Sequence, residues 1–123
     1  MSPALQALVA SGALTASQAR AAAMWSADLD ATGGAAPKPG AGRRSVKGPA
    51  NVMASAARAR LRAFENRCGG RGSRWYRIAY LALHVGHGVE AVAQLLDQEP
   101  LAVRGVVRLA GQTLAGIYQS GEG

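Results

Sequence analysis

The stretch that decides the fold runs from Val89 to Tyr118 and reads VEAVAQLLDQEPLAVRGVVRLAGQTLAGIY. Apolar residues recur at helical spacing before Asp97 and again after Pro100, which predicts two amphipathic helices. Proline is tolerated at the first position of a helix because its missing N–H would have had no partner there. We therefore expect a short helix, a tight turn and a longer helix.

Each predicted helix has one side that fits burial, with Val89, Val92, Ala93 and Leu96 in the first and Val103, Val107, Ala110, Leu114 and Tyr118 in the second. The second helix also has a polar outer side. This plan is typical of a helix-turn-helix, in which the second helix enters the major groove of DNA. The alternative is a two-helix hairpin within an ordinary all-α core.

The spacing also resembles the helix-turn-helix of sigma factor region 4 and of LuxR-type regulators. The matching positions are Gly86, Glu90, Ala93, Leu96, Val103, Val107, Ala110 and Leu114. Ala93 fits because a larger side chain would separate the two crossing helices. Asp97 departs from the pattern, since the family usually has glycine there, and aspartate tolerates a turn conformation less well than glycine.

The charge of the chain is strongly basic and unevenly distributed. The net charge is +7 over 123 residues, and Glu65 is the only acid within a basic third of the chain. The basic residues of that third are Arg43, Arg44, Lys47, Arg58, Arg60, Arg62, Arg67, Arg71, Arg74 and Arg77. Such an uneven positive charge predicts an acidic partner, with nucleic acid as the first candidate, and binding that weakens as the salt concentration rises. A role in solubility and a compositional bias toward arginine are the alternatives.

Several classes of protein are disfavoured by the sequence. Cys68 is the single cysteine and has no internal disulfide partner, which favours a reducing cytoplasm. We expect no secretory signal, and the longest apolar run, Ile78 to Val85, is too short to span a bilayer. His84 and His87 lack the further ligands of a metal site, and no nucleophile–base–acid set is visible. We therefore expect no metal, no cofactor and no enzymatic activity.

The first thirty residues predict a helical hairpin. Its first helix runs from Pro3 to Ala10, and Gly12 stops it. Thr15 with Gln18 forms a capping-box pattern for a second helix. That helix is expected from about Ala16 to Leu29, with an apolar side of Ala22, Trp25 and Leu29. Asp28 and Asp30 near its end oppose the helix dipole and favour fraying. The hairpin is either additional core or an element for homodimerisation or polymerase docking.

Two further helices are expected after a Gly/Pro-rich basic linker. One runs from a cap at Asn51 to Arg67, with a buried stripe of Met53, Ala57, Leu61, Phe64 and Cys68 and a solvated arginine face. The glycines at 69–72 predict a turn, and Ser73 is the expected cap of a helix from Arg74 to Val85. Trp75, Ile78, Ala82 and Val85 form its apolar face, and we expect Trp75 to anchor the core.

Three groups of short motifs support a resemblance over most of the chain: Gly12, Leu14, Gln18, Ala21 and Ala22; the run from Ala57 to Leu61; and Leu114, Ala115 and Tyr118. In these the chain resembles the C-terminal domain of alphaproteobacterial helix-turn-helix proteins related to activators of gene transfer agents, the phage-like particles of those bacteria. The resemblance implies transcriptional regulation through contact with RNA polymerase.

The sequence thus predicts an all-α protein with an N-terminal helical hairpin at 1–30, a flexible basic linker at 31–49 and a DNA-binding domain at 50–120. A sigma-region-4-like unit at 74–118 contains the helix-turn-helix at 89–118. The predicted function is a small transcription regulator that binds double-stranded DNA in the nucleoid, acting with RNA polymerase. The alternatives are a polymerase-binding or antitermination module that does not read bases and a phage-type small terminase subunit.

Two sets of residues are predicted to contact DNA. The base-edge candidates are Arg104, Arg108, Gln112 and Ala102, the last through contact with a thymine methyl group. The phosphate-contact candidates are Arg58, Arg62, Arg71, Arg74, Arg77, Arg43, Arg44 and Lys47.

Overall fold

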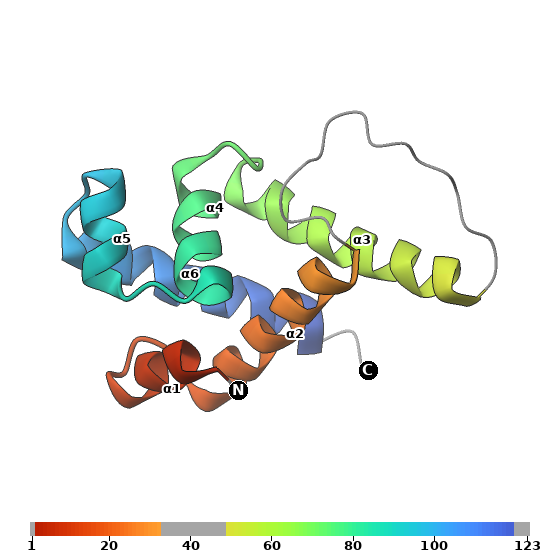
Figure 1. Cartoon of the computed structure of the whole chain (residues 1–123), viewed down its shortest axis with the longest axis horizontal. Coiled ribbons are helices and arrows are strands. Elements are labelled where there is room, and N and C mark those ends of the chain that lie inside the picture. The colour runs from red at the N-terminus through yellow and green to blue at the C-terminus, as the bar shows by residue number, and fades with distance from the viewer. Residues whose placement is uncertain (1, 33–48, 120–123) are drawn as a thin grey trace.

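The computed structural model describes residues 2–32 and 49–119, with side chains from residue 55 onward in the second range. These residues form helices and no strand, which confirms the all-α class. The elements are α1 (Pro3–Ala10), α2 (Ala16–Thr32), α3 (Pro49–Cys68), α4 (Arg74–Ala79), the π-helix η1 (Tyr80–Val85), α5 (Val89–Leu96) and α6 (Pro100–Gln119). Figure 1 shows α6 running behind α4 and α5, with α1 and α2 along its other side.

Helix α2 begins where local chemistry predicts. The Thr15 N–H donates to Gln18 Oε1 and the Gln18 N–H donates to Thr15 Oγ1, both at 3.1 Å, which confirms the capping box. The helix continues to Thr32, three residues beyond its predicted end at Leu29, and the Asp28 carboxylate is bonded to other helices.

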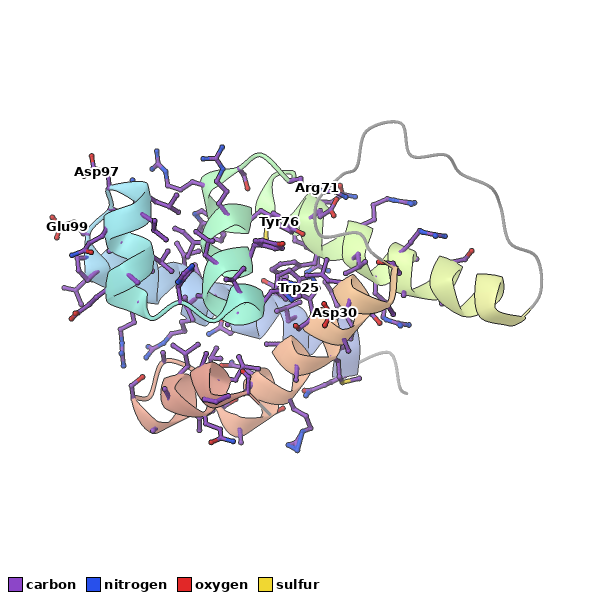
Figure 2. All side chains as sticks on the ribbon, in the orientation of Figure 1. Trp25, Asp30, Arg71, Tyr76, Asp97 and Glu99 are labelled. Carbon is purple, nitrogen blue, oxygen red and sulfur yellow. The ribbon has the colours of Figure 1, made fainter. Side chains whose placement is uncertain are left out.

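The core is built around Trp25 of α2. Its indole is fully buried and meets the Phe64 ring edge-on at a centroid distance of 5.1 Å and the Tyr76 ring at 6.2 Å. Figure 2 shows Trp25 and Tyr76 in the middle of the molecule. The prediction that Trp75 anchors the core is wrong, because α4 turns Tyr76, Ile78 and Ala79 inward and leaves Trp75 41% exposed.

The predicted helix from Arg74 to Val85 changes its hydrogen bonding at Tyr80. The backbone N–H groups of Gly86 and His87 both donate to the Leu81 carbonyl, at 3.0 and 2.9 Å, so the last turns are wider than in an α-helix. The wider turns rotate the chain, and Val85, expected on the buried face, is 49% exposed.

Helix α3 begins at Pro49, so Asn51 lies inside its first turn and the predicted cap position is wrong. Ala57, Leu61 and Phe64 are buried as the stripe predicts, and Cys68 is half-buried. Burial raises the pKa of the Cys68 thiol to about 11, with a further contribution from the Glu65 carboxylate.

Helix α6 lies at the centre of the packing and contacts α2, α3, α4 and α5. Its predicted apolar side is confirmed, since Val103, Val107, Ala110, Leu114 and Tyr118 are all buried. The N-terminal helices bury their apolar residues in the same cluster as these side chains. The predicted hairpin is therefore packed on the helices of the predicted DNA-binding region, and the linker residues 33–48 lie outside the described ranges.

Candidate functional site

The turn between α5 and α6 has the geometry that a tight helix–helix junction requires. Asp97 adopts the left-handed conformation with φ 56° and ψ 51°, and it is the one described residue other than glycine with a positive φ. The N–H of Gln98 donates to the Ala93 carbonyl at 2.8 Å and closes the end of α5. Asp97 thus occupies a position for which glycine is the least strained residue.

The outer side of α6 carries an exposed surface that begins next to this turn. Its exposed members between residues 101 and 112 are Leu101, Ala102, Gly105, Arg108, Leu109 and Gln112. A Cβ added at Gly105 would meet no atom within 4 Å, so the helix backbone is uncovered there. This surface includes three of the four residues that the sequence predicts for base contacts.

Arg104 and Arg108 both contact the turn between α1 and α2. The Arg104 Nη2 donates to the Ser11 carbonyl at 2.6 Å, and the Arg108 Nη2 donates to the Gly12 carbonyl at 3.2 Å. Arg104 is half-buried in this position, whereas Arg108 stays exposed. Gly12 has a φ of +86°, and a Cβ on it would lie 3.6 Å from Arg104 Nη2. The turn between α1 and α2 therefore covers part of the outer side of α6. The helical spacing in the sequence did not indicate this contact.

The predicted phosphate contacts are distributed over α3, the loop that follows it and α4. Arg58 and Arg62 are exposed one turn apart on α3, and Arg74 and Arg77 are exposed on α4. The remaining described candidate, Arg71, is held in the loop by Glu65. Arg43, Arg44 and Lys47 lie outside the described residues.

One hollow brings three of these arginines together. It has a volume of about 180 Å³ and is lined by Thr32, Arg58, Leu61, Arg62, Glu65 and Arg71. Arg71 donates from Nε and Nη2 to the same Glu65 oxygen, Oε2, at 3.2 and 3.1 Å. Figure 2 labels Arg71 where α3 gives way to the loop before α4. The lining thus combines one apolar residue, Leu61, with an excess of positive charge.

A polar network that the sequence did not reveal joins α2, α3 and α6. Asp28 accepts hydrogen bonds from Arg60 Nε at 2.9 Å and Nη2 at 3.1 Å, and from the Tyr118 hydroxyl at 2.7 Å. The hydrogen bond to Asp28 raises the pKa of Arg60, and burial with the same carboxylate raises the pKa of Tyr118. Arg60, expected on a solvated face, has a side chain that is 41% exposed and is also paired, because α2 brings a carboxylate to α3.

A second contact missed by the sequence involves His84. Its Nδ1 lies 2.7 Å from Ser26 Oγ, and its Nε2 lies 3.8 Å from the Asp30 carboxylate, which is beyond hydrogen-bond length. Asp30 is 75% exposed, and the imidazole packs against the rings of Trp25 and Tyr80. In the sequence, the signal for this contact was the spacing of Ser26 and Asp30, which places them one turn apart on α2.

No group of three or more His, Cys, Asp or Glu side chains in residues 2–32 and 49–119 is placed to hold a metal ion. Within the same ranges, the structure contains no helix that is long and apolar enough to cross a membrane. No protein-family model matches the chain, and neither the curated proteins nor the solved structures gave a match.

Proposed function

We propose that this protein binds double-stranded DNA through α5 and α6 and acts as a small transcription regulator. The observation that carries the proposal is the uncovered outer side of α6 directly after the left-handed turn at Asp97. In a helix-turn-helix this is the part of the second helix that enters the major groove. The α4–η1, α5 and α6 segments then correspond to the sigma-region-4-like unit.

The contacts of the arginines suggest a division of roles on α6. Arg104 is half-buried against the Ser11 carbonyl, which favours a role in holding α6 against the N-terminal helices. Arg108 uses Nη2 on the Gly12 carbonyl and remains exposed, so its other N–H groups are available to a guanine edge. Gln112 is exposed one turn further along, and Ala102 offers a methyl contact to thymine.

The test begins with selection of a preferred duplex from a random library by the full chain, followed by fluorescence anisotropy titration. Arg108→Ala and Gln112→Ala should each weaken binding to the selected duplex by about 1–3 kcal/mol. Arg20→Ala removes the same charge as Arg108→Ala from an exposed position on α2 and serves as the matched control. Equal loss in Arg108→Ala and Arg20→Ala would contradict base reading by α6.

A second candidate is a module that binds RNA polymerase or an antitermination complex without reading bases. The observation in its favour is that Leu95 and Leu101, on either side of the turn, are 59% and 80% exposed. Uncovered leucines are typical of protein contacts rather than base contacts. Chromatin immunoprecipitation separates the two: a promoter-bound regulator gives fixed peaks, whereas a polymerase-bound module follows transcribed genes.

The resemblance to gene transfer agent activators favours promoters of phage-like genes as the targets of a regulator. Such an activator would hold DNA and polymerase at the same time, and the exposed leucines and Arg108 belong to adjoining parts of α5 and α6. A Leu95→Ser/Leu101→Ser variant that keeps duplex affinity but loses transcription in a reconstituted assay would support this arrangement.

A further inference from the structure

The hollow between α3 and the loop before α4 has the features of a preformed anion site. Three guanidinium groups and a single carboxylate line it, so its field is positive. Among the described residues no acid forms an ion pair with Arg58 or Arg62, and both are exposed. Their charge is therefore available to a ligand.

Glu65 gives this hollow a fixed geometry. Its Oε2 accepts both Nε–H and an Nη2–H of Arg71, which orients the plane of that guanidinium. The Glu65 side chain is only 17% exposed, so the pair is less screened by salt than a pair in open water. The Arg71 N–H groups that Glu65 does not use remain as donors, and an orientated arginine loses less entropy on binding than a free one.

The size and chemistry of the hollow identify the ligand class. With a volume of about 180 Å³ it fits one phosphate group, and Leu61 is the apolar residue in its lining. Arginine presents paired N–H donors that match two oxygens of a phosphate. A flat surface rich in carboxylates would not provide such donors. A whole nucleotide would need an additional apolar or aromatic surface for its base.

We infer that Arg58, Arg62 and Arg71 bind one phosphate group in this hollow, with Glu65 as a positioning residue. The inference rests on the proposed DNA-binding function only for the source of the phosphate, which would be the DNA backbone. A phosphate held there would fix the register of the protein on the duplex without specifying sequence.

The experiment uses the full chain and a matched set of variants. Arg62→Ala removes a charge from the hollow, and Arg67→Ala removes the same charge from an exposed position of α3 outside its lining. Glu65→Gln adds one unit of net positive charge and removes the ion pair that orients Arg71. Two readouts are taken: anisotropy titration with a duplex at several salt concentrations, and melting temperature in phosphate against chloride at equal ionic strength.

Binding of a backbone phosphate predicts that Arg62→Ala weakens duplex affinity about tenfold and lowers the salt slope by about 1, with a smaller effect of Arg67→Ala. Glu65→Gln should also weaken binding in spite of its added charge. If the wild type binds no duplex but phosphate raises its melting temperature, and Arg62→Ala abolishes that rise, the hollow is a site for free phosphate and the proposed DNA function fails.

Three results would overturn the inference. The first is equal loss of duplex affinity in Arg62→Ala and Arg67→Ala, which indicates a diffuse basic field. The second is tighter duplex binding by Glu65→Gln, which indicates that net charge alone matters. The third is a wild type that responds neither to duplex nor to phosphate.

Discussion

The packing of Gly111 on the N-terminal helices offers the sharpest test of the structure. Gly111 is buried in the middle of α6, and a Cβ built on it would overlap Cδ2 of Leu14 and lie 3.3 Å from the Cβ of Gln18. Leu14 is itself buried, so its methyl group has little room to move away. The absence of a side chain at position 111 thus allows the α1–α2 turn and α6 to approach closely.

The expected effect of Gly111→Ala follows from two opposing terms. Replacing glycine by alanine inside a helix usually raises the free energy of unfolding by about 1 kcal/mol. Overpacking against a buried side chain costs about 1–3 kcal/mol. The net expectation is a free energy of unfolding that stays level or falls by up to about 2 kcal/mol.

Gly105→Ala is the matched control, because Gly105 lies on the same helix and a Cβ there meets nothing within 4 Å. This variant should gain the full helix-propensity term of about 1 kcal/mol. Urea denaturation followed by circular dichroism at the helical band measures both values on the full chain. If Gly111→Ala proves as stabilising as Gly105→Ala, the close approach of Leu14 to α6 is wrong.

Three other predictions concern single positions. Asp97→Gly should raise the free energy of unfolding by about 0.5–1 kcal/mol in urea denaturation, because Asp97 has a φ of 56°, and a loss would contradict the left-handed turn. Tyr118→Phe should lower the free energy of unfolding by about 1–2 kcal/mol, because it removes the hydrogen bond to Asp28. Tyr76→Phe should leave the free energy of unfolding unchanged, because the buried Tyr76 hydroxyl has no hydrogen-bond partner among the described residues. Folding raises the pKa of the Cys68 thiol from 9.0 to about 11, so the unfolded chain loses this proton at a lower pH than the folded chain. The free energy of unfolding should therefore fall as the pH rises from 9 to 11. Thermal melting across this pH range should show a less steep fall in Cys68→Ala.

The parts of the fold that could be predicted from the sequence are those set by local periodicity and local caps. The buried side of α6 follows from its apolar spacing, and the start of α2 follows from Thr15 and Gln18 three residues apart. Both depend on residues within a few turns of each other. The all-α class follows in the same way, because no stretch of the chain has the alternation of a strand.

The features that the sequence did not reveal depend on residues far apart in the chain. The bonds from Asp28 to Arg60 and Tyr118 span 32 and 90 residues, and no local pattern marks a carboxylate as their common acceptor. Trp75 and Trp25 have similar intrinsic burial preferences, and only the packing of α2 decides which one enters the core. The π-helical turns after Tyr80 likewise have no signal in apolar spacing, because that spacing assumes an α-helix.

The same long-range packing decides what kind of surface α6 can offer. The N-terminal helices meet α6 at Ser11 and Gly12, next to the arginines predicted to face DNA, and this position would suit a removable lid. Trp25 argues against that role, because its fully buried indole ties α2 to Phe64 of α3 and Tyr76 of α4. Lifting α2 would expose this aromatic cluster to water, which is strongly unfavourable because such rings bury large apolar areas. The α1–α2 turn is therefore a permanent neighbour of Arg108, and any ligand that reaches α6 must also accommodate the turn.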